Sequence, residues 1–420
     1  MTEIRADWPL TNLGEEFEIQ QGKSLSPNSR RGQKPRPFLR TSNVLWGRVD
    51  LTTVDQMDFT DEEFSRLSLV DGDLLVCEGG DIGRAAVYRG PSGHYAYQNH
   101  LHRLRAKTDQ IIPDFVVHWL RAAFTQLGLY EGVGNKTTIP NLSRARLAQL
   151  QIPKPDPDEQ RQVASILGNV QRAIEVQAAI CDKLAALKSA TMAKLFREGL
   201  RGEPLKQTEI GEIPESWEVV RLGDRCKLKS GGTPSRAVPE YWGGDIPWVK
   251  TTEINYREIR DTDEKITQLG LENSSAKVFD KGTVLMAMYG QGVTRGRVAL
   301  LGIPAATNQA CAAFFPDETI SPRFLHAYFT HAYERVRELG HGANQRNLSL
   351  ELLEDVKIPV PKSIDEQEEI SHIVADLQRR IELSETKVTV LNRLFCSALH
   401  ALMTGAIRVK DLNLAEVSHV

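Results

Sequence analysis

Ile152-Pro153-Lys154-Pro155, then Asp158-Glu159-Gln160 and a long run without proline, is the stretch that decides the fold. The pattern returns about two hundred residues later as Ile358-Pro359-Val360-Pro361, then Asp365-Glu366-Gln367 and a second such run. A run without proline can remain helical, and acidic residues suit the positive end of a helix dipole. Asp158 and Asp365 are the expected N-caps. Each copy therefore predicts the end of a globular unit and the start of a long helix.

Both runs carry apolar residues at the three-and-four spacing of a helix face. These are Val163, Ile166, Val170, Ala173, Ile180, Leu184 and Leu187, interrupted by Gln177, and Val374, Leu377, Ile381, Val388, Leu391, Phe395, Ala398 and Leu402, interrupted by Ser384. Some 35 to 40 residues at about 1.5 Å each give a helix of roughly 55–60 Å. A stripe of that length needs a partner, and the other copy is the obvious one. The alternative is that each helix packs on its own globular domain.

The repetition extends over almost the whole chain and keeps its order. The matched pairs are Trp8 with Trp217, Leu13-Gly14 with Leu222-Gly223, Gln21-Gly22 with Ser230-Gly231, residues 36–41 with 246–251, 71–76 with 281–286, 83–86 with 296–299, 113–115 with 322–324, and Asn141-Leu142-Ser143 with Asn347-Leu348-Ser349. An unbroken order of this length indicates a tandem duplication.

Each half mixes short strands with a few helices. Gly72 and Gly282 precede apolar runs, as turns leading into strands do, and Pro113 and Pro322 stand where a helix N-terminus tolerates proline. The fold class is therefore α+β, with a mixed sheet and helices in each half. The predicted division is a first domain at 1–151, a central helix at 152–203, a second domain at 204–357, a C-terminal helix at 358–410 and a tail at 411–420.

Composition excludes several classes of protein. Hydrophobic residues make up 41% of the chain and charged residues 25%, as in ordinary globular proteins. The apolar runs are shorter than the roughly 18 residues that a membrane span needs, and the N-terminus does not resemble a signal peptide. The 5 cysteines form no CxxC pair, which fits reduced thiols in a cytoplasm.

The net charge is −3, but the charges are unevenly distributed. Residues 19–49 contain seven basic side chains and no acidic one, whereas residues 50–81 contain ten carboxylates and one arginine, Arg66. One interpretation is two solvated faces of opposite charge. The functional interpretation is one surface for a polyanion and another for a protein partner.

In this order, the repeated features resemble those of the specificity (S) subunits of type I restriction–modification enzymes. The resemblance rests on the Trp…Leu-Gly start, residues 246–251, Gly72-Asp73-Leu74-Leu75, Asn308-Gln309, the Asn-Leu-Ser segments and the two Ile-Pro-x-Pro…Glu-Gln stretches. The first half departs from the pattern at Phe38-Leu39, where the second has Trp248-Val249, and at Gln98-Asn99-His100.

The resemblance implies two target-recognition domains on two long antiparallel helices that form a coiled coil, in a pseudo-twofold tandem repeat. It implies a non-catalytic, DNA-binding subunit of a restriction system that reads an asymmetric split sequence in double-stranded DNA. Each domain would read one half-site, and the helices would set the unread gap. Two methyltransferase (M) subunits would dock on the helices, and two motor-nuclease (R) subunits would join the larger assembly. S-adenosylmethionine, ATP and Mg²⁺ would act only in those partners.

Cationic and polar side chains near matched segments are the candidate DNA contacts, because phosphate contacts position a protein and nearby polar groups read base edges. The candidates are Lys23, Arg30, Arg31, Lys34, Arg36, Arg40 and Arg84 in the first half, and Lys229, Arg236, Lys250, Thr251, Tyr289, Gln291, Arg295 and Arg297 in the second. Lys227 belongs to the same basic group. Each taken alone is an ordinary surface residue.

Catalytic signatures are weak. The glycine-rich segments 78–84 and 289–297 are followed by predicted strands, which indicates turns between strands and no nucleotide loop. Asp317, Asp355 and Lys357 only superficially match a nuclease set, and His100, His102, His326 and His331 lack a further ligand at metal spacing. The alternatives to a specificity subunit are a single-chain DNA-modifying or cleaving enzyme with divergent catalytic residues, and a scaffold that pairs proteins without reading DNA.

Overall fold

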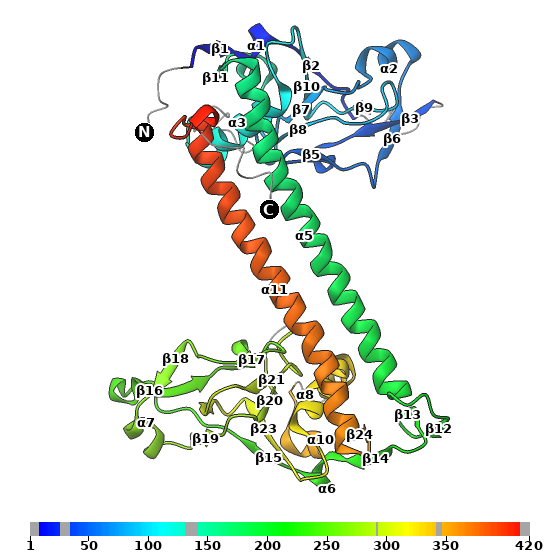
Figure 1. The fold of residues 1–420 in the computed structure, drawn as a ribbon, viewed down its shortest axis with the longest axis vertical. Coiled ribbons are helices and arrows are strands. Elements are labelled where there is room, and N and C mark those ends of the chain that lie inside the picture. The colour runs from blue at the N-terminus through cyan, green and yellow to red at the C-terminus, as the bar shows by residue number, and fades with distance from the viewer. Residues whose placement is uncertain (1–7, 26–33, 131–141, 291–292, 342–346, 412–420) are drawn as a thin grey trace. The chain divides into compact units, whose positions relative to one another are not determined.

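The computed structural model describes residues 8–25, 34–130, 142–290, 293–341 and 347–411. The chain falls into two units, residues 1–178 with 386–420, and residues 179–385. Two long helices, α5 (Pro157–Glu198) and α11 (Ile364–Met403), each contribute to both units. Each unit therefore contains one globular domain with part of each long helix (Figure 1).

The first domain has a larger antiparallel sheet in the order β2 (Phe17–Gln21), β10 (Leu101–Ala106), β7 (Leu74–Cys77) and β8 (Ala85–Val87). A smaller sheet has the order β6 (Asp55–Asp58), β3 (Pro35–Leu39) and β9 (Ala96–Tyr97). Leu74 and Val76 of β7 share a core with α3 (Pro113–Thr125), whereas Leu75 and Cys77 share one with the smaller sheet. Strand β7 is an unbroken apolar run because both of its faces are buried.

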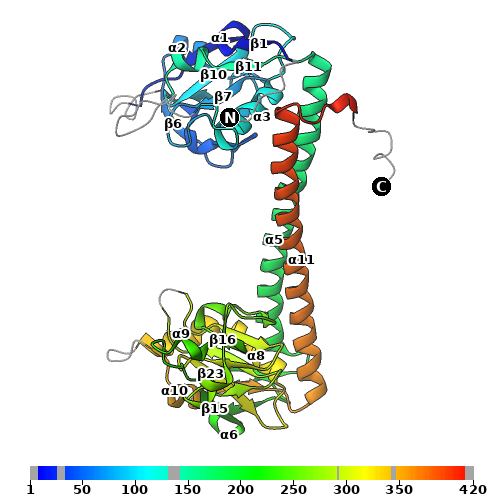
Figure 2. The ribbon, with the colours of Figure 1, turned by 90° about the vertical axis from the view of Figure 1, so that its left-hand side faces the viewer.

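The second domain repeats this plan. Its larger sheet has the order β15 (Cys226–Ser230), β23 (Cys311–Pro316), β20 (Val284–Ala287), β21 (Val298–Leu301) and β17 (Glu258–Ile259). Its smaller sheet has the order β18 (Glu264–Ile266), β16 (Trp242–Val249), β22 (Ala305–Thr307) and β19 (Val278–Phe279). Helix α8 (Pro322–His331) corresponds to α3 and lies between the sheet and the long helices (Figure 2). The common strand order confirms the duplication.

Short elements complete both domains. In the first they are β1 (Leu10–Asn12), α1 (Leu13–Glu16), η1 (Thr41–Asn43), β4 (Val44–Leu45), β5 (Arg48–Val49), α2 (Asp61–Leu67), α4 (Arg144–Ala148) and β11 (Gln151–Pro153), and η5 (Val409–Asp411) follows α11. In the second they are β12 (Leu205–Thr208), β13 (Gly211–Pro214), β14 (Glu218–Arg221), α6 (Leu222–Arg225), η2 (Pro239–Tyr241), η3 (Thr251–Glu253), α7 (Gln268–Glu272), α9 (Tyr333–Glu338), η4 (Leu339–His341), α10 (Leu350–Glu354) and β24 (Lys357–Val360). Strands β1 and β11, and likewise β14 and β24, pair antiparallel and join the start of each repeat to its Ile-Pro segment.

The repeated glycines after β2 and β15 lie where the chain crosses the smaller sheet. A Cβ atom on Gly22 would stand 2.3 Å from the Tyr97 carbonyl oxygen, and one on Gly231 would stand 2.1 Å from the Thr307 carbonyl oxygen. Backbone atoms cannot move aside as a flexible side chain can, so both positions require glycine. This explains why Gln21-Gly22 and Ser230-Gly231 match in sequence.

The predicted N-caps are wrong by two residues. Asp158 and Asp365 lie inside the first turns of α5 and α11. Asp156 Oδ1 accepts the Asp158 amide at 2.9 Å, and Ser363 Oγ accepts the Glu366 amide at 3.4 Å. Pro157 and Ile364 occupy the first helical positions, and proline is favoured there because its missing N–H would have no partner in the helix.

The apolar stripe predicted for α11 is confirmed, since Val374, Ile381, Phe395 and Leu402 are buried. The α5 stripe is wrong in its second half, where Ile180 is 40% exposed and Leu187 is 52% exposed. A polar residue occupies the contact position there: the Lys188 ammonium donates to Gln378 of α11 at 2.7 Å. In this part of α5, the apolar pattern alone therefore predicts the wrong residues to face α11.

Both proposed modes of helix packing occur. Val163 and Leu167 of α5 belong to the core of the first domain, together with Leu399 and Leu402 of α11. In the second unit, Phe196 of α5 packs edge-on against Phe324 of α8, with ring centroids 5.7 Å apart. Each long helix thus packs on a globular domain and on the other helix within a unit.

The glutamine of each Asp-Glu-Gln motif joins a long helix to its domain. Gln160 is fully buried, and its Oε1 accepts the Ile112 amide at 2.8 Å. Its Nε2 donates to the Pro155 and Gln110 carbonyls at 2.8 Å and 3.0 Å. Gln367 makes the same three kinds of bond, to the Ser321 amide at 2.7 Å and to the Pro361 and Thr319 carbonyls at 2.8 Å and 2.9 Å.

The glutamate of the same motif binds the repeated tryptophan and the end of the other long helix. Glu159 accepts from the Trp8 indole N–H at 3.3 Å, and from Nε and Nη2 of Arg408 at 2.6 Å and 2.7 Å. Glu366 accepts the Trp217 indole N–H at 3.2 Å, and Arg201 lies 3.5 Å away. We call Trp8, Glu159 and Gln160, and their equivalents Trp217, Glu366 and Gln367, the two junctions.

We expect Gly22→Ala and Gly231→Ala each to lower the free energy of unfolding by about 1–3 kcal/mol, because the added methyl group overlaps backbone oxygen. Chemical denaturation measures this. Gly168→Ala is the matched control, since a Cβ there meets only the end of the Arg172 side chain at 3.5 Å. Alanine at that helical site should stabilise by roughly 0.5–1 kcal/mol. Wild-type stability in the first two variants would contradict the close approach of Gly22 and Gly231 to these carbonyl oxygens.

We expect Gln160→Glu and Gln367→Glu each to destabilise the protein by about 1–3 kcal/mol or more, because a buried carboxylate oxygen would face two carbonyl oxygens in place of a donor. The exposed Gln162→Glu, on the opposite side of α5 from the buried contact, should change stability by less than about 0.5 kcal/mol. Denaturant titrations of all three variants compare them. Equal stabilities would show that the junction amides contribute little.

Candidate nucleic-acid interface

The basic stretch of the first domain is paired with the acidic run that follows it. Strands β3 and β6 are antiparallel neighbours, with Arg36 opposite Met57. Asp61 consequently lies 2.8 Å from Lys34 Nζ and 3.4 Å from an Arg36 nitrogen. Arg40 pairs with Asp55 at 2.6 Å. For these residues the strand pairing brings the two charge runs together, which contradicts both the interpretation as two solvated faces of opposite charge and the interpretation as two separate binding surfaces.

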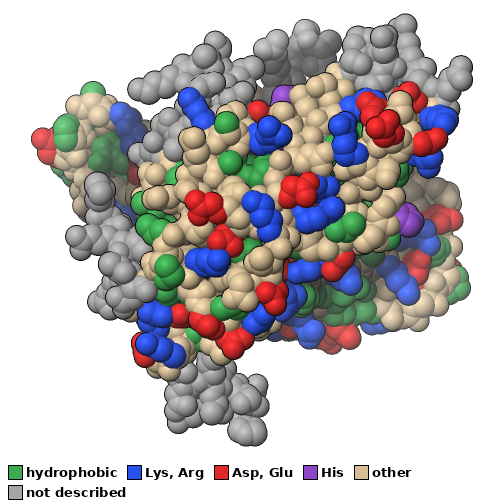
Figure 3. Space-filling view, turned by 90° about the horizontal axis from the view of Figure 1, so that it is seen from above, with side chains coloured by type: hydrophobic (Ala, Val, Ile, Leu, Met, Phe, Trp, Pro, Cys, Tyr) green, Lys and Arg blue, Asp and Glu red, His purple; other side chains and the backbone are tan. Residues whose placement is uncertain are grey.

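Lys23 is the most enclosed of these cations. Its Nζ lies 2.6 Å from Glu63 and 5.1 Å from the centroid of the Phe59 ring. The Lys23 hydrogen bond lowers the pKa of Glu63, and the Lys34 hydrogen bond likewise lowers the pKa of Asp61. Figure 3 shows Lys and Arg side chains interspersed with Asp and Glu over the face that it presents. A nucleic-acid contact on this side would have to compete with the local carboxylates.

The glycine-rich segment 78–84 is a turn between β7 and β8, as predicted, with positive φ angles at Gly80 and Gly83. Arg84 donates to Asp81 at 2.5 Å and to the Thr41 carbonyl at 2.9 Å. These bonds hold the Arg84 guanidinium between the turn and η1.

In the second domain, Arg236 stacks on a pair of tryptophans. Its guanidinium carbon lies 3.6 Å from the Trp242 ring centroid and 5.2 Å from that of Trp248, and it pairs with Glu264 at 2.7 Å. Lys250 lies 3.3 Å from Asp263, and Thr251 begins η3. Arg236 and Lys250 correspond in the repeat to the basic stretch of the first domain. Like Lys34 and Arg40 of that stretch, each has an acidic neighbour.

Two other cations of this domain have no such neighbour. Lys227 and Lys229 lie on β15 and are exposed. Within the described residues, neither ammonium lies at ion-pair distance from a carboxylate, although Lys229 Nζ stands 5.4 Å from the Phe315 ring centroid. They are therefore candidates whose positive charge no carboxylate of the described residues compensates.

The remaining candidates cluster after β20. Tyr289 is 42% exposed. Arg295 donates to the Gly340 carbonyl at 3.5 Å, and the Arg297 guanidinium lies 5.7 Å from the Tyr256 ring centroid. Arg30, Arg31, Gln291 and Asn141 lie outside the described residues. The DNA-contact assignments as a whole stay predictions.

The weak catalytic patterns do not assemble. Asp317 accepts from Thr319, Asp355 accepts from Arg221, and Lys357 donates to Glu209. His102 is buried and its Nε2 lies 2.9 Å from the Leu142 carbonyl. Within the described ranges, no three His, Cys, Asp or Glu side chains form a group that could hold a metal ion. In that same part of the chain, no helix is long and apolar enough to cross a membrane.

The duplicated domain is the feature that known proteins share. The family model described as "Type I restriction modification DNA specificity domain" matches residues 5–186 and again residues 214–393. The chain belongs to this family. It is a specificity subunit with two DNA-specificity domains, and the resemblance inferred from the sequence is confirmed.

Relatives of known name agree with this assignment. A Methanocaldococcus jannaschii protein assigned as the specificity subunit of the type I restriction enzyme MjaX is 25% identical over 417 residues, covering 97% of this chain and 95% of that protein. The EcoR124I/EcoR124II specificity subunit of Escherichia coli is 26% identical over 264 residues, covering 62% of each chain. The crystal structure of the type I S subunit from M. genitalium has the same fold, with a TM-score of 0.63, 17% identity, and coverage of 96% of this chain and 99% of that one.

We expect Lys227→Glu and Lys229→Glu each to weaken DNA binding across sequences and to reduce the slope of log affinity against log salt by about 1, because each removes one phosphate contact. Fluorescence-anisotropy titrations at several salt concentrations measure both quantities. Arg380→Glu on α11 is the control and should leave the slope unchanged. A wild-type slope in both β15 variants would exclude this strand from the interface.

Proposed function

We propose that this specificity subunit reads an asymmetric, split sequence in double-stranded DNA, with one domain for each half-site. The observation that carries the proposal is that the larger sheets of the two domains share one strand order, whereas their smaller sheets differ. Two similar domains on one chain can engage two half-sites, as the two halves of a dimeric DNA-binding protein do. Because this is a single chain, the two readers can differ in sequence.

The domains differ most in the smaller sheet. In the first it has three strands, and β3 has 5 residues; in the second it has four strands, and β16 has 8 residues. The Trp242–Trp248 ring contact at 5.0 Å belongs to the second domain, where the first has the plain Phe38-Leu39 pair. Different side chains on equivalent sheets would meet different base edges, so the two half-sites should differ.

The specificity subunit would act as a non-catalytic scaffold for two copies of a methyltransferase subunit, one on each unit. Its long helices expose apolar side chains in both units, and apolar side chains that lie together on a surface mark interaction sites. In the first unit these are Val176, Val390 and Leu394, and in the second Ile180, Leu187 and Leu383. Val176 and Leu383, and also Leu187 and Leu394, occupy equivalent positions of the duplicated helices, which supports one kind of partner bound twice.

The chemistry would take place in the partners. S-adenosylmethionine would be bound by the methyltransferase subunits, and ATP and Mg²⁺ by two motor-nuclease subunits where these join the assembly. The cysteines are free thiols, Cys77, Cys226 and Cys311 among them buried, which supports a cytoplasmic location. We do not propose the alternative of a single-chain enzyme. Turnover by the purified chain alone with DNA, these cofactors and Mg²⁺ would contradict the proposal.

Domain exchange tests whether each domain reads one half-site. Residues 1–150 are replaced by those of another specificity subunit, and the methylated sites are mapped by sequencing after co-expression with the methyltransferase subunit. We expect one half-site to change, with the second half-site and the gap retained. The reciprocal exchange of residues 204–357 should change the other half-site only. A change in both half-sites after either exchange would contradict one domain for each half-site.

A further inference from the structure

A second polar motif is repeated within the long helices, eleven residues after the junction glutamines. It reads Gln171-Arg172-Ala173-Ile174-Glu175 in α5 and Gln378-Arg379-Arg380-Ile381-Glu382 in α11. Most other solvent-facing positions of the two helices differ. A partly exposed motif retained in both copies suggests a role that both copies perform.

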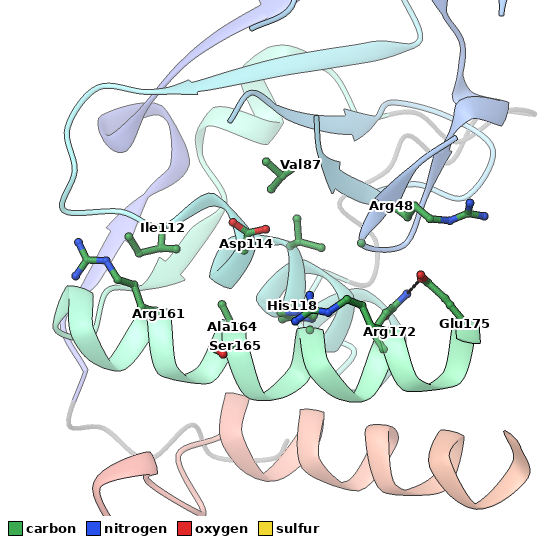
Figure 4. Close-up of a pocket in the computed structure, with 14 residues that line it drawn as sticks. Arg48, Val87, Ile112, Asp114, His118, Arg161, Ala164, Ser165, Arg172 and Glu175 are labelled. Carbon is green, nitrogen blue, oxygen red and sulfur yellow. Dashed lines mark hydrogen bonds between the residues drawn. The ribbon is translucent and has the colours of Figure 1, made fainter. Parts of the chain in front are cut away.

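In the first unit this motif lines a cavity of about 360 Å³ between α5 and the first domain (Figure 4). Gln171, Arg172 and Glu175 contribute from the helix, and Arg48, Asp114 and His118 are among the residues that face it from the domain. Figure 4 shows Arg172 on α5 with its side chain extending toward His118, and Arg48 on the domain side of this region. The cavity has both charged and apolar walls and is large enough to accept a side chain of another protein.

In the second unit the equivalent motif lines an equivalent cavity of about 270 Å³. Gln378, Arg379 and Glu382 contribute from α11, and Arg257, Arg323 and His326 face it from the second domain. Arg48 and Arg257 correspond, because each follows a residue with positive φ, Gly47 in one turn and Tyr256 in the other. The amides of Gly47 and Tyr256 also bond to equivalent strands, β8 and β21. The two cavities are therefore copies of one site.

The fold accounts for the glutamine and the glutamate of the motif. Gln171 accepts from Arg121 at 2.7 Å and donates to the Trp46 carbonyl at 2.9 Å, and Gln378 accepts from Lys188 at 2.7 Å. Each glutamine also donates to the glutamate one turn later, at 3.2 Å in α5 and 3.0 Å in α11. These contacts join helix to domain or helix to helix, so the structure needs both residue types.

The arginine has no comparable structural role. Within the described residues, Arg172 bonds only to Asn169 and Arg379 only to Asp376, each three positions earlier in its own helix. Exposed pairs of this kind contribute about 0–1 kcal/mol. Arginine side chains beside a pocket are, by contrast, frequent anchors at protein interfaces. The retained arginine is therefore better explained by a contact with another molecule.

Each cavity also contains an unsatisfied histidine. His118 is 6% exposed and its Nδ1 has no hydrogen-bond partner within the described residues; the same holds for Nε2 of His326. Burial lowers the pKa of His118 to about 3 and that of His326 to about 4, so both rings are neutral near pH 7. A neutral imidazole offers one donor and one acceptor. A polar group from a partner could supply what each ring lacks.

We propose that each cavity receives an acidic side chain from one copy of the same partner protein, with Arg172 and Arg379 as the two anchors. Guanidinium groups bind carboxylates through two parallel hydrogen bonds. A concave site between a long helix and a globular domain suits a single side chain better than an extended phosphate backbone. The inference rests on the proposed function, in which that partner is the methyltransferase subunit.

Native mass spectrometry of the purified chain mixed with the organism's methyltransferase subunit tests the two anchors. We expect two bound copies on the wild-type chain, one on Arg172→Glu, one on Arg379→Glu and none on the double variant. Titrations should show roughly tenfold to hundredfold weaker binding at the altered cavity. Arg172→Gln and Arg379→Gln, which keep helix propensity, should weaken binding in the same direction but less.

Arg380→Glu is the matched control, because Arg380 binds the same Asp376 at 2.7 Å and does not line the cavity. It should retain both partner copies. If Arg379→Glu also keeps both, the cavity is not a docking site. If the Arg172→Glu and Arg379→Glu complexes keep both copies but lose DNA affinity with a smaller salt slope, the cavities contact phosphate and the proposal is overturned. A wild-type chain that binds no methyltransferase copy would contradict the proposed function itself.

Discussion

The buried amide of Gln160, with its equivalent Gln367, is the contact on which each unit depends. A helix N-terminus leaves backbone groups without partners, and so do the loops before α3 and α8. The single glutamine satisfies an amide on one side and two carbonyls on the other. Because the Gln160 and Gln367 side chains are fully buried, a bond that either amide fails to make costs its desolvation penalty. The direction in which a long helix leaves its domain is fixed by this geometry.

The glutamate beside it extends the same junction to the other long helix. Glu366 binds Trp217 of its own repeat and lies against Arg201, just after α5 ends, while Glu159 binds Trp8 and Arg408, just after α11 ends. Each junction therefore joins the start of one long helix, the end of the other and the first residues of a repeat. This arrangement explains why Trp, Glu and Gln recur together although they are far apart in the sequence.

On the first domain, strand pairing brings cationic side chains next to carboxylates that compensate their charge. Lys34 and Arg36 precede Asp61 by only a short stretch of chain, and the antiparallel pairing of β3 and β6 brings them into contact. Arg172 and Arg379, which are repeated in the long helices, differ from these cations: within the described residues, each bonds only to a residue of its own helix. Charge that the fold does not use is the better indicator of an intermolecular contact.

The sequence by itself determined the duplication, the α+β class, the long helices and the family, because these follow from local periodicity and from order along the chain. It also identified the Trp, Glu, Gln and Gly positions of the repeat, though not their roles. Only the tertiary structure decided that Ile180 and Leu187 face outward, that Asp156 and Ser363 cap the helices, and that Lys34 and Arg36 pair with Asp61. Those outcomes depend on which residues distant in the chain come to lie side by side, and a periodic pattern carries no such information.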